Sequence, residues 1–357
     1  MSKVAVFSKL EMSGGSEFRC VELCNGLARF TDNEVFLLAE HKIPDKIQKY
    51  LDPKVQVICD VFSSPKYFYD LDVLLIVNTD TKDFSLKDYW LGKTARHNIP
   101  IDLNRMVGKK IFFLYNFLVS PSRHLSELSS EGWDIRILVT NTNFFNEIGK
   151  QDRYDSVKIL PRYILESPIN PDLLIIRERK VEEEAPVVFG MHSKRAGSKW
   201  NDDIPKLINK VNQRYGEDRI KFRFMGIKGE LTPKLAPFEN AKCLKEDEEI
   251  VKDFINSLDV FLFFPDWKRE EPWSRVVAEG MVAGCPIIAL DKGGTKDQVL
   301  HLNNGFLCKN FDDYYNRIIY FMEHKNTILE MSKNSLRISK SFYTEKIIQK
   351  FMDMVKI

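Results

Sequence analysis

The chain has 357 residues, about twice the length of a typical domain, so we expect two domains of similar size. Hydrophobic residues make up 44% of it and charged residues 29%, which excludes a disordered chain, a collagen-like repeat and a disulfide-stapled mini-protein. With 53 Lys and Arg against 51 Asp and Glu, the formal charge is +2, so a polyanionic partner would have to bind a local basic patch.

Apolar runs in the chain are short. The first turns polar at Ser8 after four apolar residues, and no later run approaches the ~20 apolar residues of a membrane span. Cys20 and Cys24 share a predicted helix face, but no second pair completes a zinc set. We therefore expect no transmembrane segment, reduced core thiols, and a cytoplasmic protein or one bound peripherally at a membrane surface.

Short apolar segments alternate with amphipathic segments of helical length, twice over. In the first half the predicted strands are Val4–Phe7, Glu34–Leu38, Val55–Ile58, Val73–Val77, Lys110–Leu114 and Ile135–Val139. In the second half they are Val187–Phe189, Phe222–Met225, Val260–Phe264, Pro286–Leu290 and Gly305–Leu307. A helix is predicted over Glu17–Phe30, where apolar residues recur at i, i+3 and i+4. This alternation predicts α/β domains with parallel sheets covered on both faces.

The break between the halves falls around residues 165–186, where three prolines and a run of charges interrupt the periodicity. We expect an N-terminal Rossmann-like domain over 1–170 and a C-terminal one over 171–340. A last amphipathic helix over 341–357 is expected to pack back on the first domain. Two such domains would face a cleft at the carboxyl ends of both sheets, the usual ligand position in doubly wound folds.

The sequence SGGSE at 13–17 lies between a predicted strand and a predicted helix. Its glycines, Gly14 and Gly15, let the backbone approach a ligand, and the N–H groups of the helix start favour an anion. The segment lacks the full GxGxxG spacing of a dinucleotide site, and a plain tight turn is the alternative interpretation.

The segment from Glu270 to Val299 is the richest in the chain. Pro272 suits the first position of a helix, so Trp273, Ser274 and Arg275 would supply the free N–H groups of its first turn. Glu271 then lies just before this helix and Glu279 two turns inside it. Carboxylates eight residues apart on this frame suit two hydroxyl-bearing parts of one ligand, with phosphates between them.

After the second glutamate come a small-residue helix end at Gly284, a proline, an apolar strand and the Gly293-Gly294 turn. With the two glutamates, this order resembles the retaining GT4-like (group 1) nucleotide-sugar glycosyltransferases, which have the two-domain GT-B fold. SGGSE, DVFLFFPDW before the first glutamate and NNGFLC at 303–308 resemble further segments of that family. The resemblance spans both domains and implies two Rossmann-like domains facing a cleft.

The segment VVFGMHSKRAGSKW at 187–200 resembles the strand after which the family places two cations on the donor diphosphate. Lys199 matches the second cation. Where the family often has an arginine this chain has Met191, so Lys194 or Arg195 would have to take the first role. The alternative interpretation of any of these residues is a solvated loop cation.

The resemblance implies that the donor is a nucleoside diphosphate sugar, most simply a UDP- or GDP-sugar, with no cofactor and no metal. Glu271 would orient the sugar hydroxyls and Glu279 would bind the ribose. Lys199 and the helix start at Trp273 and Ser274 would stabilise the charge that develops on the departing diphosphate. No enzyme nucleophile is evident, which fits the family's front-face retaining reaction.

Residues 93–110 carry five cations against one acid, a local charge of +4 that includes Arg96 and Arg105. We take this as a hypothesis of an anionic acceptor: a lipid-linked glycan at a membrane surface, a phosphate polymer or nucleic acid. A solvated loop is the alternative. No role is transferred to Asn116 or His124, where the family tends to place a histidine near the sugar.

Two further patterns are interpreted as structural. The acidic pair Asp70 and Asp72 precedes a strand, where solvation explains it better than a metal. Trp267 and Trp273 suit core packing better than stacking on a ligand ring.

Other functions stay open at this point. They are a phage-type DNA base glycosyltransferase, a nucleotide-sugar epimerase or sugar phosphorylase of the same fold, and a non-catalytic sugar-nucleotide binding subunit. An epimerase or phosphorylase would turn over the donor without a separate acceptor. A binding subunit would have no need of both glutamates and Lys199.

Overall fold

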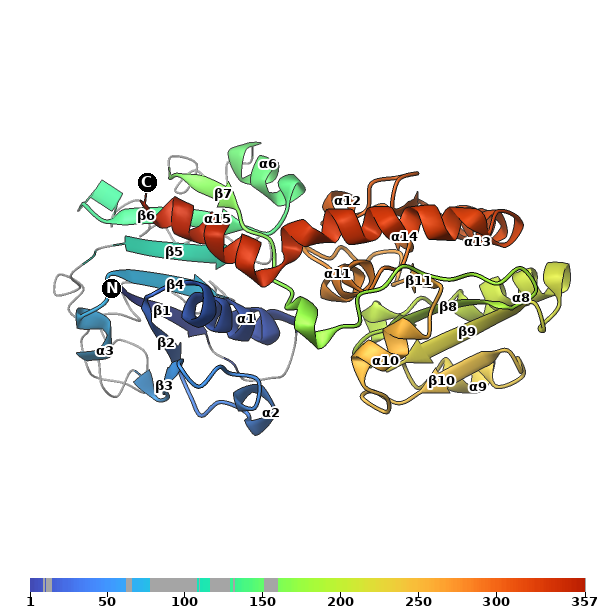
Figure 1. Ribbon diagram of the computed structural model, residues 1–357, viewed down its shortest axis with the longest axis horizontal. Helices are drawn as coiled ribbons and strands as arrows, with labels where there is room; N and C mark the ends of the chain where they lie inside the picture. The colour runs from blue at the N-terminus through green and yellow to red at the C-terminus, as the bar shows by residue number, and fades with distance from the viewer. Residues whose placement is uncertain are drawn as a thin grey trace. The chain divides into compact units, whose positions relative to one another are not determined.

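The computed structural model describes residues 1–8, 10, 15–61, 66–77, 108, 110–115, 129, 130, 132–150 and 160–356. The chain divides into two units (Figure 1), one made of Met1–Ile169 with Thr344–Ile357 and the other of Asn170–Tyr343. The sequence-based boundaries were 170/171 and 340/341. Each unit is an α/β domain.

The N-terminal unit is built on a parallel sheet whose strands run in the order β3-β2-β1-β4-β5-β6-β7. Its strands are β1 (Lys3–Ser8), β2 (Glu34–Ala39), β3 (Gln56–Ile58), β4 (Val73–Val77), β5 (Lys110–Tyr115), β6 (Asp134–Val139) and β7 (Arg162–Ile164). The central strands are continuous apolar runs because both of their faces are covered. Strand β4, for example, is buried at every position.

Helices cover both faces of this sheet. They are α1 (Gly15–Phe30), α2 (Asp45–Gln48), α3 (Lys66–Tyr69), α6 (Thr142–Lys150) and the C-terminal α15 (Thr344–Lys356). One core packs the apolar faces of α1 and α15 against alternate side chains of the strands. The second core packs Phe68 of α3 and Phe144 of α6 against the other face. Helix α1 approaches α15 closely at Gly26, where a Cβ atom would touch Ile348.

The C-terminal helix is also held to the first unit by polar contacts. Lys110 Nζ donates to Val355 O at 2.8 Å, and Arg136 donates to Met354 O, so two cations meet the last carbonyls of α15. At the middle of the helix, Lys350 Nζ lies 2.7 Å from Glu166 Oε2. Helix α15 is therefore a part of the N-terminal unit although it follows the whole of the second unit in sequence.

The C-terminal unit has a parallel sheet in the order β10-β9-β8-β11-β12-β13. Its strands are β8 (Val187–His192), β9 (Ile220–Met225), β10 (Ala241–Leu244), β11 (Val260–Phe263), β12 (Ile287–Leu290) and β13 (Gly305–Cys308). Its helices are α8 (Ile204–Tyr215), α9 (Thr232–Leu235), α10 (Val251–Asn256), α11 (Arg275–Val282), α12 (Thr295–Gln298), α13 (Phe311–Glu323) and α14 (Asn326–Ser339), with 3-10 turns at η4 (Pro171–Leu173), η5 (Gly197–Lys199) and η6 (Lys340–Phe342).

One buried cation, Arg179, contacts the carboxyl ends of two helices of this unit, α10 and α11. Arg179, in the segment before β8, is 2% exposed. Its guanidinium donates to Ala283 O at 2.7 Å, after the end of α11, and to Leu258 O at 2.7 Å and Asn256 O at 2.9 Å, at the end of α10. A positive charge at two helix C-termini satisfies their last carbonyls and complements both helix dipoles.

The expected fold class is confirmed: two parallel sheets with helices, in two Rossmann-like domains. Strands β7 and β10 were not predicted, since both are short edge strands in which at most one residue is fully buried. In the described part of the chain, no helix combines the length and the apolar character that a membrane crossing needs.

Candidate functional site

The carboxyl ends of the central strands of the C-terminal unit bring the predicted site residues together. In a parallel sheet these ends meet at one edge, where ligands bind in doubly wound folds. The segment after β8 runs through η5 and carries Lys199. The segment after its neighbour β11 carries Glu271, and the segment after β12 carries Gly293 and Gly294.

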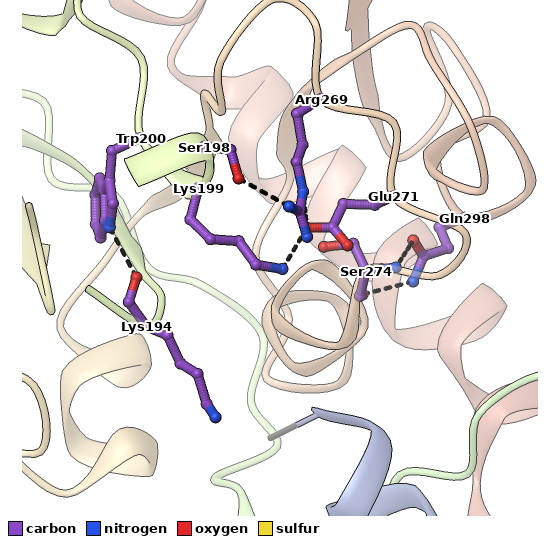
Figure 2. Close-up of polar contacts among 8 residues, drawn as sticks. All are labelled: Lys194, Ser198, Lys199, Trp200, Arg269, Glu271, Ser274 and Gln298. Atoms are coloured by element: carbon purple, nitrogen blue, oxygen red, sulfur yellow. Dashed lines mark hydrogen bonds and ion pairs between the residues drawn. The ribbon is translucent and has the colours of Figure 1, made fainter. Parts of the chain in front are cut away.

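Glu271 is buried, with 7% of its surface exposed, and two cations hold one of its oxygens. Lys199 Nζ contacts Oε1, and Arg269 Nε donates to the same Oε1 at 2.8 Å (Figure 2). Arg269 also donates to Ser198 Oγ at 2.8 Å, which joins the segment after β11 to η5. The structure thus brings the predicted pair Glu271 and Lys199 together and adds Arg269, which sequence reasoning missed.

The Gly293-Gly294 turn fixes the backbone that carries Glu271. The N–H of Gly294 donates to Glu271 O at 2.8 Å. A Cβ atom on Gly293 would overlap Glu271 O, and one on Gly294 would overlap Pro272 O. Gly293 also has a φ of +57°, in the left-handed region that favours glycine. These two glycines therefore allow the loop after β12 to close on residues 271 and 272.

The helix that carries Glu279 begins later than predicted. Helix α11 starts at Arg275 rather than at Pro272, and Ser274 before it is extended, with φ −90° and ψ 101°. The Gln298 side chain explains the difference, since its Oε1 accepts from Ser274 N at 3.3 Å and its Nε2 donates to Ser274 O at 2.9 Å (Figure 2). The N–H of Ser274 was expected to be open to an anion, and it is instead engaged by Gln298. Glu279 lies just over one turn inside α11 rather than two.

Glu279 is held by side chains from two elements. Arg275 Nε donates to its Oε1 at 2.8 Å, and His192 Nε2, at the end of β8, lies 3.2 Å from its Oε2. Burial by itself would raise the pKa of this carboxyl, but the charge of Arg275 and the contact with His192 outweigh it, so the pKa of Glu279 is lowered. Glu279 is therefore an ionised acceptor at neutral pH.

His192 was missed in the sequence, although it stands in the quoted segment 187–200. Its ring packs edge-on against Phe254 at 6.1 Å and Phe261 at 5.9 Å between ring centroids. A signal was present, since a polar residue closes an otherwise apolar central strand at the edge where ligands bind.

The two candidates for the first diphosphate cation lie elsewhere in the same loop. The Lys194 side chain is exposed and points away from the Lys199–Glu271 pair (Figure 2), while its carbonyl accepts from Trp200 Nε1 at 3.1 Å. The Arg195 guanidinium lies against Gly229, and its backbone N–H donates to Glu246 Oε2 at 3.1 Å. Neither side chain has a contact with the Glu271 carboxylate among the described residues.

The aromatic residues interpreted as structural pack against other rings, and Asp72 accepts a backbone hydrogen bond. Trp267 packs edge-on against Phe264, and Trp273 packs edge-on against Phe342 with centroids 4.8 Å apart. The carboxylate of Asp72 accepts from the N–H of Lys3 at 2.7 Å, at the start of β1.

Several predicted residues lie outside the described residues: Gly14, Arg96, Arg105, Asn116 and His124. Gly15, the partner of Gly14 in the glycine loop, is the first residue of α1.

Residues 233–337 match the family model "Glycosyl transferases group 1". Among curated proteins, the trehalose synthases of Thermococcus litoralis and Pyrococcus furiosus are each 31% identical to this chain over 106 residues. That segment is 29% of this chain and 25% of each relative, so it spans about a quarter of their length.

Solved structures resemble the whole chain. A glycosyltransferase from Rickettsia africae has a TM-score of 0.75 at 12% identity, covering 99% of this chain and 98% of its own. Anabaena Alr3699/HepE in complex with UDP has a TM-score of 0.72 at 14% identity, with both chains fully covered. Sucrose-phosphate synthase from Thermosynechococcus elongatus has a TM-score of 0.66 at 14% identity, covering 100% of this chain and 98% of its own.

These likenesses establish the fold over the whole chain, and the match to the family model is confined to residues 233–337. The segment contains Glu271, Glu279 and the Gly293-Gly294 turn, which carried the resemblance in the sequence. The expected GT-B fold is confirmed: this chain has the two-domain GT-B glycosyltransferase fold, and residues 233–337 of its C-terminal unit match the group 1 glycosyl transferase model.

Proposed function

We propose that this protein is a retaining, GT4-type glycosyltransferase that moves a sugar from a nucleoside diphosphate sugar to an acceptor. The observation that carries the proposal is the arrangement at one sheet edge of two carboxylates and two cations: Glu271 with Lys199 and Arg269, and Glu279 just over one turn into α11. The crystal structures of Anabaena HepE with UDP and with UDP-glucose support a uridine diphosphate donor.

In this reaction the main contribution of the protein is electrostatic stabilisation of the departing diphosphate. When the bond between the sugar and the diphosphate breaks, negative charge grows on the diphosphate. Lys199 and the positive end of the α11 dipole stabilise that charge, and a well-placed donor of this kind contributes roughly 3–4 kcal/mol to catalysis. The ionised Glu279 accepts from the ribose hydroxyls, and Glu271 accepts from hydroxyls of the transferred sugar. This chemistry needs no metal ion, and we expect EDTA to leave activity unchanged.

We further propose an anionic acceptor that binds the N-terminal domain through Arg96 and Arg105. The support is the local charge of +4 over residues 93–110 in a chain whose total is +2. Reversal of both residues to Glu should weaken acceptor binding and leave donor binding unchanged. A polyanionic acceptor also releases counterions, so its affinity should fall steeply with salt. A neutral acceptor predicts flat activity from low to moderate salt and no effect of the reversal.

The first experiment is incubation with a panel of UDP-, GDP- and ADP-sugars, with and without candidate acceptors, followed by mass spectrometry of the products. A new glycoside whose anomeric configuration by NMR equals that of the donor supports a retaining transferase, and an inverted product contradicts it. Donor turnover without any acceptor would favour an epimerase or phosphorylase. Tight donor binding with no product under any acceptor would favour a non-catalytic subunit.

A further inference from the structure

Two cations contact the same carboxylate, that of Glu271. Both Lys199 Nζ and Arg269 Nε contact its Oε1, while the side chain itself is only 8% exposed. The cations come from different segments, Lys199 from η5 after β8 and Arg269 from the loop after β11. The three groups together carry one net positive charge. The site therefore contains its own anion, the Glu271 carboxylate, and has one positive charge more than that anion balances.

The two cations are themselves partly withdrawn from water. The Lys199 side chain is 26% exposed and that of Arg269 is 24% exposed. Because a desolvated charge without a counter-charge is costly, two such cations close together need an anion between them. In the ligand-free protein Glu271 is that anion.

We propose that Lys199 and Arg269 form the subsite for the donor's diphosphate, and that the Glu271 carboxylate occupies this subsite as an internal counter-anion until the donor binds. The proposal deepens the proposed function and rests on it. It assigns to Arg269 the role that the sequence had left to Lys194 or Arg195. A guanidinium suits this role, since its planar fork of donors matches two phosphate oxygens.

An exchange of partners follows. A diphosphate carries more negative charge than one carboxylate, so it competes for both cations and draws them away from Oε1. The Glu271 carboxylate is then available to accept hydrogen bonds from hydroxyl groups of the sugar. Binding of the diphosphate would in this way prepare the group that recognises the sugar.

The competition predicts opposite effects for the two kinds of residue. Glu271→Gln removes the internal competitor, so a nucleoside diphosphate without its sugar should bind about tenfold more tightly than to the wild type. Arg269→Gln and Lys199→Ala each remove a cation and should weaken the same binding by about tenfold. The matched control is Glu270→Gln, which removes the same charge from the adjacent, exposed residue and should change the affinity less than twofold.

The test is titration calorimetry of the full chain and these variants with UDP, GDP and inorganic pyrophosphate. Thermal unfolding by circular dichroism checks that each variant is folded. If Glu271→Gln does not fold, Glu271→Ala replaces it, and Arg269→Lys serves in the same way for Arg269→Gln. Arg269→Lys retains the charge and should fall between the wild type and Arg269→Gln.

The outcomes separate this proposal from the function on which it rests. Unchanged or weaker binding to folded Glu271→Gln overturns the internal counter-anion, and unchanged binding to Arg269→Gln removes Arg269 from the subsite. If pyrophosphate shows the predicted pattern and neither nucleoside diphosphate binds, the subsite stands and the proposed donor fails. If none of the three ligands binds the wild type, both proposals fail.

Discussion

His192 Nε2 lies 3.2 Å from Glu279 Oε2, and only 9% of the His192 side chain and 12% of the Glu279 side chain are exposed. The ring nitrogen is within ion-pair distance but is not aligned for a hydrogen bond. Arg275 Nε donates to the other carboxylate oxygen at 2.8 Å, with good alignment. Glu279 is thus held between the last residue of β8 and the first turn of its own helix, which gives the unit a pH-dependent contribution to stability.

The first prediction concerns the pH dependence of that contribution. Because the pKa of Glu279 is lowered in the folded state, the unfolded chain takes up this proton at a higher pH than the folded chain does. The stabilisation is therefore complete above the usual glutamate pKa of ~4.3 and is lost as pH falls through the lowered value. We expect Glu279→Gln to cost about 3 kcal/mol of unfolding free energy at pH 7 and progressively less as the solution is acidified below pH ~4. Urea unfolding of both proteins across this range measures the difference, and a difference independent of pH would contradict it.

The second prediction isolates the His192 nitrogen. His192→Phe retains a ring against Phe254 and Phe261 but removes the group that faces Glu279. Arg275, which contacts the other carboxylate oxygen of Glu279, is unchanged in this variant. We expect the pKa of Glu279 to rise toward its usual value, so the acid loss of stability should begin at a higher pH than in the wild type. The Michaelis constant for the donor should rise severalfold with little change in turnover. An unchanged acid profile would mean that the 3.2 Å contact has no energetic effect.

The third prediction tests the backbone contact under Glu271. A methyl group on Gly294 would overlap Pro272 O, so Gly294→Ala forces the loop away from residues 271 and 272. We expect a loss of about 2–4 kcal/mol in unfolding free energy, together with weaker donor binding. Gly197→Ala is the control, since a Cβ there meets nothing within 4 Å and Gly197 belongs to η5, in the same site. Comparable losses in both variants would contradict the overlap argument.

The fourth prediction concerns Arg179. Arg179→Met leaves carbonyls at the ends of α10 and α11 without their donor, and we expect a cost of about 3–5 kcal/mol. Arg179→Lys should recover little of it, because an ammonium cannot reach both helix ends as the guanidinium fork does. Arg177→Met is the matched control, two residues away and exposed, with one hydrogen bond to Asn256 O. Chemical denaturation measures all three, and equal costs at the two positions would count against the role of Arg179.

The fold followed from the sequence because the central strands are buried on both faces and read as unbroken apolar runs. Strand β4 was predicted at its observed bounds, Val73–Val77. The edge strand β10 was not predicted, since Lys242 is exposed and only one of its four residues is fully buried. The predicted helix start at Pro272 followed a local rule that a distant side chain, Gln298, overrides by holding Ser274 extended.

The candidate site divides in the same way. Glu271 and Glu279 could be paired from the sequence because their spacing is local, and Lys199 followed from the strand that precedes it. Arg269 could not, because its contact with Ser198 joins segments that follow different strands. His192 ends an apolar strand, which is a signal in the sequence, but its contact with Glu279 follows from the fold alone. Glu271 meets Lys199 across 72 residues of sequence, and Glu279 meets His192 across 87. Only the folded sheet brings such pairs within reach.

The return of α15 to the N-terminal unit has a consequence for synthesis on the ribosome. The apolar faces of α1 and the sheet that receive Ile347, Ile348 and Phe351 are encoded within residues 1–169, whereas the helix that covers them is translated only after the C-terminal unit. The entire C-terminal unit, Asn170–Tyr343, is translated in between. The nascent chain therefore leaves these apolar faces uncovered while the second unit is synthesised. During that interval the exposed apolar surface favours aggregation or binding by a chaperone.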